Sequence, residues 1–352
     1  MFSYNHLFNF TEQVFLSMGC PEEDARLATD TILAADLRGV DSHGISRLIG
    51  YVRLWDAGRI NPKPEIKIVH ETPSTATVDG DAGLGLVVAP KVMDIAIQKA
   101  QIAGSGWISV KNSNHFGIAG YHAMRALPHD MIGWAMTNAS PLVAPTNSLD
   151  RLLGTNPIAI AIPANEEPDF IMDMSTTTAA NGKLEVLQRK KQEAPIGWIQ
   201  TKDGRDSTNA EELKLGGAMM PLGGASASYK GYALGSVVDI FSAVLSGANY
   251  GPWVPPFVSF LPLPENPVGE GIGHFLGAMR IDGFRPAAEF KAHMDNWIRT
   301  FRNSTPKPGQ QVLIPGDPER IISEIRLKEG IHLLDPVIQD LESIAQKFNL
   351  TF

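Results

Sequence analysis

Cysteine is almost absent from this sequence, and its scarcity limits the chemistry that the chain can support. The 352 residues include only Cys20, which excludes an intramolecular disulfide and a cluster of thiolate ligands around a metal. No apolar run approaches the roughly 18–20 residues that span a bilayer, and the first ten residues lack the basic and then apolar pattern of a signal peptide. We therefore expect a cytoplasmic protein with no metal site and no membrane association.

Positive charge is scarce relative to negative charge. The chain has 30 lysines and arginines against 38 aspartates and glutamates, a net charge of −8 with neutral histidines. An acidic balance argues against nucleic acid or an anionic membrane as the main partner. A small anionic substrate stays open, because one or two local cations suffice to bind it.

Several catalytic signatures are missing as well. The nearest match to the dinucleotide fingerprint GxGxxG begins with Gly83 and Gly85 but has Val88 in place of the third glycine, which argues against the usual Rossmann site. The patterns GxxxxGK[ST], HExxH and GxSxG do not occur, which argues against P-loop nucleotidases, zinc peptidases and α/β-hydrolases.

The apolar patterns predict helices at both ends of the chain. A chain of this length usually forms two or more domains. Within residues 1–60, Pro21 and the three acidic residues after it are typical of a helix start. Residues 284–352 carry an apolar stripe of helical period that includes Trp297 and Phe301. We expect these two terminal segments to pack together as a helical domain.

Residues 61–283 carry short apolar runs separated by Gly, Pro and Asn turns, which is typical of strands. We expect strands at Thr75–Val78, Trp107–Val110, Ile132–Met136, Ile158–Ile162 and Phe170–Met172, with helices at Ala89–Ala103 and after Lys230. The segment Gly251–Gly273 is rich in Pro and Gly and predicts a long loop that is functional or forms an interface. The expected fold class is α+β, with a sheet-containing central region.

The first polar motif is Asp41-Ser42-His43-Gly44, followed by Arg47 and Tyr51. Positions 43, 47 and 51 would share one face of a helix. A guanidinium there can bind the carboxylate of a 2-hydroxy acid through two hydrogen bonds, and an imidazole can exchange the proton of its hydroxyl. The alternative is an ordinary exposed helix face.

Two further motifs follow or precede predicted strands. His115 lies in the sequence KNSNHFG after one strand, Thr155 lies in GTNP before another, and DMST at residues 173–176 follows the next. Polar residues at strand ends often carry chemistry. They also fit plain turns and caps.

The last two motifs are predicted at helix starts. PLGG at residues 221–224 leads to Lys230, where backbone N–H groups and an ammonium would together hold a phosphate. The alternative is a glycine hinge with a surface lysine. Pro315-Gly316-Asp317 opens a C-terminal helix and fits a plain helix start equally well.

No single motif decides between these alternatives, but the ordered set does. The patterns DSHGxxRxxxY, NSNHFG, TNASP, GTNPIAIAIP, DMST, PLGG…KGY and GHFLGAM follow one another between residues 41 and 279. This set resembles the type-2 malate/L-lactate dehydrogenase family, whose relatives include sulfolactate dehydrogenase, ureidoglycolate dehydrogenase, 2,3-diketogulonate reductase and piperideine-2-carboxylate reductase. The resemblance covers nearly the whole chain.

The resemblance implies a non-Rossmann NAD(P)-binding fold with a mostly antiparallel central sheet and a helical domain made from both chain ends. It implies a homodimer whose active sites lie near the subunit boundary. The implied reaction is hydride transfer between a nicotinamide and a small 2-hydroxy or 2-keto acid, first of all L-malate and oxaloacetate. Sulfolactate, L-lactate and ureidoglycolate stay open as substrates, and reduction of a cyclic imine is the runner-up reaction.

Carried over position by position, the resemblance assigns roles to particular residues. His43 and His115 become candidates for the group that moves the hydroxyl proton. The residues implied for the substrate are Ser42, Arg47, Tyr51 and Thr155, and those implied for the cofactor are Ser140, Asp173, Met174, Ser175, Lys230, Pro315, Gly316 and Asp317. An acidic Asp317 beside the adenosine ribose would favour NAD over NADP.

Two features depart from the family pattern. Tyr229 stands where a histidine often precedes the Lys-Gly pair, which puts in doubt any role borrowed for that position. The segment Asn249–Pro267 is longer than the family pattern leads us to expect, and its extra length could reshape the substrate site or the dimer surface.

Overall fold

A central sheet organises the protein. The computed structural model describes residues 1–258 and 261–352, and in these ranges seven strands pair in the order β1-β2-β3-β10-β4-β5-β6. The strands are β1 (Lys67–Glu71), β2 (Thr75–Gly83), β3 (Ser105–Ser113), β4 (Met131–Thr137), β5 (Ile158–Ile162), β6 (Phe170–Met174) and β10 (Ile272–Arg280). Five of the six neighbouring pairs are antiparallel, and β2 and β3 form the parallel pair. The predicted α+β class with a mostly antiparallel sheet is confirmed.

Local sequence explains the strands. Each of the five predicted strand segments lies within an observed strand. The clearest case is β5, which reads IAIAI and pairs with β4 on one side and β6 on the other, since a run of alternating β-branched residues suits a strand buried between neighbours. A second, small sheet has the order β8-β7-β9 and consists of β7 (Ile199–Gln200), β8 (Asp206–Ser207) and β9 (Ala218–Met219).

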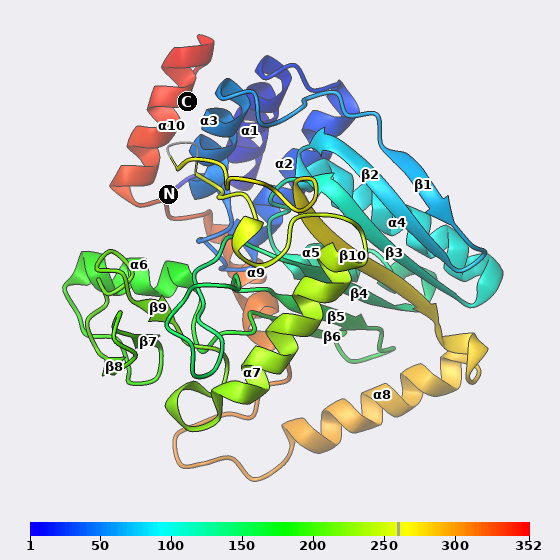
Figure 1. Ribbon diagram of the computed structural model, residues 1–352. Coiled ribbons are helices and arrows are strands. Elements are labelled where there is room, and N and C mark those ends of the chain that lie inside the picture. The colour runs from blue at the N-terminus through cyan, green and yellow to red at the C-terminus, as the bar shows by residue number, and fades with distance from the viewer. Residues whose placement is uncertain (259–260) are drawn as a thin grey trace.

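Helices cover both faces of the large sheet and gather at one end of it (Figure 1). The α-helices are α1 (Tyr4–Ser17), α2 (Glu22–Leu37), α3 (Leu48–Asp56), α4 (Gly85–Ala103), α5 (Ala119–Met124), α6 (Asn181–Lys190), α7 (Gly224–Asp239), α8 (Ala287–Arg302), α9 (Asp317–Glu329) and α10 (Asp335–Phe348). Among the described residues, none of these is long and apolar enough to cross a bilayer.

The main core lies between the sheet and α4 with α5. Val92 and Ala96 of α4 pack with Ile108 of β3 and Leu276 of β10, all fully buried. Helix α4 connects β2 to β3, because two parallel strands cannot be joined by a tight turn and need a crossover. On the other face, Val238 of α7 joins a smaller cluster that includes residues of β4 and β10.

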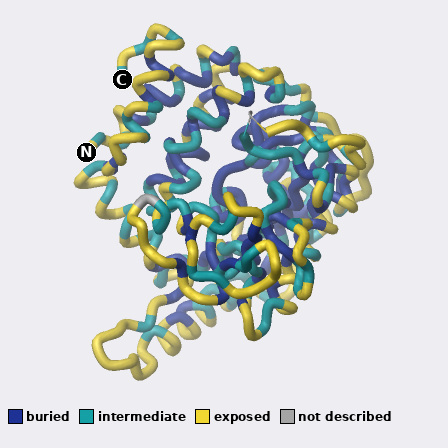
Figure 2. The backbone as a smooth tube through the Cα atoms, turned by 60° about the vertical axis from the view of Figure 1, so that its left-hand side comes forward, coloured by how far each residue is buried: buried dark blue, intermediate teal, exposed yellow. Residues whose placement is uncertain are grey.

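Helices from the two ends of the chain share a second core. Leu7 and Phe15 of α1, Leu48 of α3, and Leu341 and Ile344 of α10 are buried in one cluster. Figure 1 shows α10 beside α1 and α3, and α9 also contacts α2. Figure 2 shows the buried backbone concentrated in the middle of the molecule, with exposed segments around it. We keep the division at residues 60 and 283 as a proposal.

Helix α8 does not join this helical group, contrary to the expectation for residues 284–352. Figure 1 shows it along the opposite edge of the molecule. Asp295 of α8 accepts backbone N–H groups from residues 165–167, in the β5–β6 turn, and Arg299 pairs with Glu166 in the same turn. These polar contacts hold α8 there, so Trp297 and Phe301 of its apolar stripe stay 39% and 49% exposed.

Candidate active site

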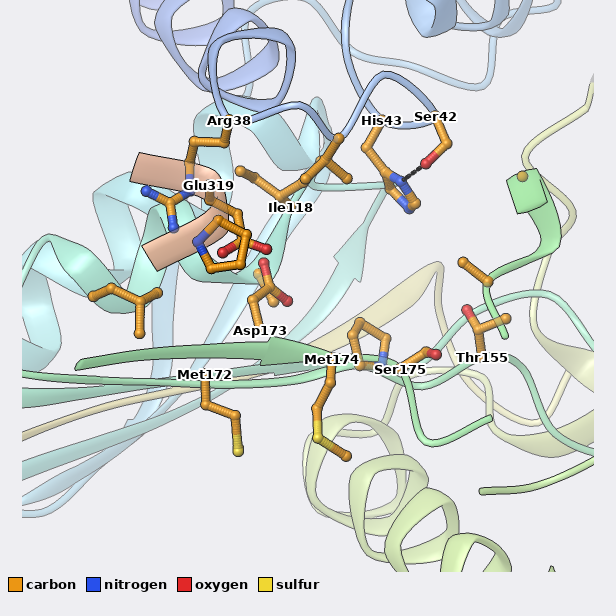
Figure 3. Close-up of a pocket in the computed structure, with 18 of the residues that line it drawn as sticks. Arg38, Ser42, His43, Ile118, Thr155, Met172, Asp173, Met174, Ser175 and Glu319 are labelled. Carbon is orange, nitrogen blue, oxygen red and sulfur yellow. Dashed lines mark hydrogen bonds between the residues drawn. The ribbon is translucent and has the colours of Figure 1, made fainter. Parts of the chain in front are cut away.

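Several segments that are distant in sequence enclose a cavity of about 580 Å³. The main ones are residues 38–47 after α2, residues 117–119 at the start of α5, β6 with Ser175 after it, and residues 313–319 at the start of α9; Leu142, residues 155–157 before β5 and residues 180–182 at the start of α6 complete the lining. Figure 3 shows His43 and Ser42 on one side of this cavity and Arg38, Glu319 and Asp173 on another. The cavity therefore has two ends, each with its own charged groups.

The motif at residues 41–51 does not form one helix, so the predicted common face is wrong. Residues 41–44 form a turn, Ile45–Arg47 form one 3₁₀ turn, and α3 begins at Leu48. His43 and Arg47 nevertheless line the same cavity, together with Ser42. Tyr51 instead lies fully buried on α3, behind the cavity wall.

His43 and His115 form a stacked pair. Their ring centroids lie 5.6 Å apart with an interplanar angle of 22°. His43 faces the cavity, and His115 lies behind it, where its Nδ1 is 2.6 Å from the Tyr51 hydroxyl. The backbone N–H of Gly117 also donates to that Nδ1 at 3.3 Å, so this nitrogen accepts and the proton of the neutral ring is assigned to Nε2.

The surroundings keep both imidazoles neutral. Burial, and then the charge of Arg47, lower the pKa of His43 to about 4. Burial, and then the charge of His43, hold the pKa of His115 well below its ordinary value. A neutral ring has a free lone pair for a proton, but a pKa of about 4 makes His43 a weak base until a bound anion offsets the charge of Arg47. Ser42 Oγ lies 2.9 Å from His43 Nδ1 and fixes the orientation of the ring.

Arg47 has two terminal nitrogens left for a ligand. Its Nε donates to the Ser42 carbonyl at 2.5 Å, which fixes the guanidinium plane. One terminal nitrogen lies 4.0 Å from Glu185 Oε2 on α6, a long ion pair. The edge of the guanidinium formed by its two terminal nitrogens can therefore bind a carboxylate through two hydrogen bonds.

Strand β6 supplies a carboxyl group to the middle of the cavity. Figure 3 shows the Asp173 side chain pointing into the cavity and the Met174 side chain pointing to the other side of the strand, as the alternation of strand side chains requires. Met174 is nevertheless one of the residues that line the cavity. Burial raises the pKa of Asp173 to about 6, against the opposing effects of the Gly120 N–H, which it accepts at 2.7 Å, and of Arg38. Ser175 and Thr155 also line the cavity.

Of the three cofactor residues predicted just before and at the start of α9, two line the cavity and one does not. Pro315 and Gly316 line the cavity. Gly316 has φ +101°, and a Cβ there would lie 3.0 Å from Ile171 Cβ, so a side chain would strain the backbone and narrow the wall. Asp317 turns inward: it is 5% exposed, accepts the Ile314 N–H and pairs with Arg302. The prediction that Asp317 faces a ribose is therefore wrong.

Two predicted cofactor residues lie outside the cavity wall. Ser140 accepts the Phe257 N–H at 3.3 Å and donates to the Pro255 carbonyl at 3.4 Å, so it holds a loop. Lys230 is exposed in the first part of α7, which begins at Gly224 and is interrupted by non-helical backbone at Ala227. Lys230 does not line the cavity of the single chain, and the phosphate site expected there stays a prediction.

The long Pro- and Gly-rich loop reaches the histidine pair. Phe257 lies against His115, with ring centroids 4.5 Å apart, and against Tyr51, at 5.0 Å. Residues 259 and 260 of the predicted loop lie outside the described residues. Phe257 closes the rear of the site and keeps solvent away from His115, which contributes to the burial that lowers its pKa.

Sequence reasoning missed Arg38 and Glu319, which both line the cavity. Arg38 follows the last residue of α2, and burial lowers its pKa against the opposing charges of Glu319 and Asp173. Glu319 stands two residues after Asp317, in the first turn of α9. The motif around residue 41 begins just after Arg38, so a wider window would have included this cation.

Comparison with known proteins agrees with this arrangement. The family model for malate/L-lactate dehydrogenase matches residues 2–342. This chain belongs to the malate/L-lactate dehydrogenase family. It is 42% identical to malate dehydrogenase of Pyrococcus abyssi over 347 residues, which cover 97% of this chain and 93% of the relative. It is 39% identical to L-sulfolactate dehydrogenase of Methanocaldococcus jannaschii over 337 residues, which cover 96% of this chain and 94% of the relative.

Solved structures agree as well. Malate dehydrogenase from Pyrococcus horikoshii superposes with a TM-score of 0.90 at 38% identity, over 99% of this chain and 96% of that one. The resemblance read from the ordered motifs is confirmed, and the chain is an oxidoreductase of the 2-hydroxyacid dehydrogenase type. Family membership implies a nicotinamide cofactor.

The surroundings of His43 lead to a testable prediction about the pKa of its imidazole. We expect its imidazole to titrate near pH 4 in the free enzyme, because burial and Arg47 both disfavour the charged ring. Histidine-selective ¹⁵N NMR measures this, with the His43 signals identified by their loss in His43→Gln. In Arg47→Met the pKa should rise, since one of the two causes is removed. Titration of His43 near pH 6.5 in the unsubstituted enzyme would contradict the burial described above.

Proposed function

We propose that this enzyme interconverts a small 2-hydroxy acid and its 2-keto acid with NAD, with L-malate and oxaloacetate as the substrate pair. The observation that carries the proposal is that His43 and Arg47 line one cavity, opposite Asp173. The names of the relatives favour malate. Sulfolactate, which the names of three relatives give, L-lactate and ureidoglycolate are the other acids to be tested.

The residues at the second end of the cavity fit a nicotinamide dinucleotide. The cavity of about 580 Å³ is of the size that small-molecule sites have. Arg38 supplies a cation for phosphates, and the absent side chain of Gly316 leaves room beside Ile171. The N-terminal end of α9, which carries a partial positive charge, adjoins the cavity through Pro318 and Glu319. Asp173 and Ser175 would contact the remaining polar groups. When bound, the nicotinamide donates or accepts a hydride.

This proposed cofactor site differs from a Rossmann site in its position. The Gly83–Gly85 turn, which leads from β2 into α4, lies outside the cavity lining, while the edge strand β6 and the start of α9 line it. In the Rossmann arrangement the pyrophosphate lies at the first glycine-rich strand–helix turn. The observed lining supports a non-Rossmann mode of binding.

Glu319 supports NAD over NADP. With Asp317 turned inward, Glu319 is the acidic residue from this segment that lines the cavity. A carboxylate beside a ribose accepts hydrogen bonds from its hydroxyls and repels a 2′-phosphate. Arg38 would attract such a phosphate, but it also faces Glu319 and Asp173. The balance of these charges favours the unphosphorylated ribose.

In the proposed reaction the chain's own residues orient the acid and move one proton. Arg47 binds the substrate carboxylate, while Ser42 holds both Arg47 and His43 in place. The His43–His115 pair takes the hydroxyl proton during oxidation and returns it during reduction. Orientation lowers the entropic cost of the reaction, and a positioned acid–base group contributes roughly 10²–10⁴-fold in rate.

We propose further that the enzyme is a homodimer formed through α7. The exposed face of α7 and of the π-helical turn Ile240–Val244 after it is apolar, with fractional exposures between 38% and 60%. These residues are Tyr229, Tyr232, Leu234, Val237, Ile240, Phe241, Val244 and Leu245. An apolar stripe of this length on a soluble monomer marks an interface, and a second copy can cover it symmetrically. A dimer would also bury the face of α7 that carries Lys230.

The reaction is tested by following absorbance at 340 nm with NAD and NADP against a panel of 2-keto acids, 2-hydroxy acids and a cyclic imine. We expect oxaloacetate reduction with NADH to be fastest. His43→Ala and His115→Ala should each lower kcat by roughly 10²-fold or more, since proton transfer is impaired, while the Kd for NADH from fluorescence titration changes little. Unchanged kcat in both variants, or activity with the imine alone, would refute the proposal.

Arg47→Lys tests the carboxylate contact. Lysine keeps the charge but lacks the planar pair of donors, so KM for oxaloacetate should rise by about tenfold, the equivalent of roughly 1.4 kcal/mol, with a smaller change in kcat. Lys347→Arg, a surface exchange on α10 at a residue that pairs with Asp56, serves as the control. An equal loss with substrates that lack a carboxylate would show that Arg47 acts in another way.

The dimer is tested by sedimentation analysis. Val244→Glu places a charge in the centre of the proposed interface, where burial without a partner is costly, so the variant should sediment as a monomer while the unsubstituted enzyme sediments as a dimer. Ile102→Glu, at a residue 85% exposed on α4, should leave the dimer intact. A dimeric Val244→Glu variant would place the interface elsewhere.

A further inference from the structure

A buried carboxyl group lies directly beneath the turn that carries Ser42, His43 and Arg47. Asp36, next to the last residue of α2, is 1% exposed. Its Oδ2 accepts the backbone N–H of Ile45 at 2.6 Å. Ile45 stands midway between His43 and Arg47 in the chain, so this hydrogen bond fixes the backbone from which both side chains project.

Gly44 packs so closely against the same carboxyl group that no side chain fits between them. A Cβ on Gly44 would lie 2.2 Å from the carboxyl carbon of Asp36, far inside van der Waals contact. The backbone of Gly44 has φ −87°, which any residue can adopt. Glycine is therefore required here by the proximity of Asp36 and not by the local conformation.

A second element holds the other side of the turn. Arg326 of α9 donates to the backbone carbonyl of Asp36 and pairs with the carboxylate of Asp41. The opposite end of α9 lines the cavity through Pro318 and Glu319. The turn at residues 41–47 is thus held from below by Asp36 and from the side by Arg326.

We infer that Asp36 is a positioning residue for catalysis: by bonding Ile45 and filling the space in front of Gly44, its carboxyl group sets the distance between His43 and Arg47. This inference rests on the proposed roles of His43 and Arg47. Asp36 does not line the cavity, so a ligand bound there would not touch it. It acts through the backbone of the turn.

Either protonation state of Asp36 serves this purpose. Burial raises the pKa of its carboxyl to about 8, against the opposing effect of the Ile45 N–H. A carboxylate oxygen and the carbonyl oxygen of a neutral carboxyl both accept the Ile45 N–H. Asparagine has nearly the same shape as the neutral acid and also offers a carbonyl oxygen, so Asp36→Asn should keep the turn in place while Asp36→Ala releases it.

The experiment compares these two variants by kcat, KM for oxaloacetate, Kd for NADH and Tm. In Asp36→Ala we expect kcat/KM to fall by about 100-fold, the cost of a displacement of about 1 Å at a reacting group, with both a higher KM and a lower kcat and with an unchanged Kd for NADH. Asp36→Asn should recover most of this loss. Asp24→Ala removes a buried carboxylate from the other end of α2, where it pairs with Lys91, and should lower Tm without changing KM.

Gly44→Ala provides an independent test if Asp36→Ala folds poorly. Alone it should reproduce the loss in kcat/KM, because the new Cβ displaces the turn. Combined with Asp36→Ala it should cost much less than the sum of the two changes, since the shortened side chain leaves room for the Cβ.

Additive losses, or an Asp36→Ala variant whose kcat/KM stays within twofold of the unsubstituted enzyme, would overturn the inference. The His43 and Arg47 variants separate this outcome from failure of the proposed function. If those variants lose activity and Asp36→Ala does not, only the positioning role is wrong.

Discussion

Contact between α2 and α9 is the constraint on which the site depends. Helix α2 belongs to the N-terminal part of the chain and α9 to the C-terminal part, yet residues at the end of α2 and at the start of α9 form two walls of one cavity. Arg326 ties the two helices together through Asp36 and Asp41. Because the sheet supplies another wall through β6, the complete cavity forms only when both chain ends are folded against the sheet.

The cavity is less acidic than the chain as a whole. The protein has a net charge of −8, but Arg38 and Arg47 face the cavity beside two acids, Asp173 and Glu319. Because burial weakens screening by water, two local cations outweigh a distant surplus of carboxylates for a small anion inside the cavity. Burial also keeps the two imidazoles neutral. An enzyme for anionic acids needs this combination, in which fixed cations bind and neutral rings exchange protons.

The sequence predicts the secondary structure well where periodicity is strong. The strands and the helices at both ends follow from alternation and from 3.6-residue spacing, because these patterns reflect burial on one face. The placement of α8 does not follow, since its apolar stripe predicts burial but not the partner. Polar contacts from Asp295 to the β5–β6 turn decide where it lies, and such long-range contacts leave no periodic signal.

The motifs predict which residue types form the site, but not how their side chains are oriented. The spacing of His43 and Arg47 suggests a helix, yet the two residues meet because a 3₁₀ turn brings both to the cavity. The direction of Asp317 depends on Arg302, fifteen residues upstream, and the position of Lys230 depends on where α7 begins. A linear motif records which residue types are present. It does not record which way a side chain turns when a nearby arginine or N–H competes for it.

The most direct measurement of the central claim is a crystal structure with NADH and oxalate, a dianion shaped like the reacting end of a 2-keto acid. We expect one oxalate carboxylate to bind the terminal nitrogens of Arg47 within reach of the His43–His115 pair, with the nicotinamide ring on the β6 side of the same cavity. Oxalate bound to another cation, or a nicotinamide outside this cavity, would contradict it.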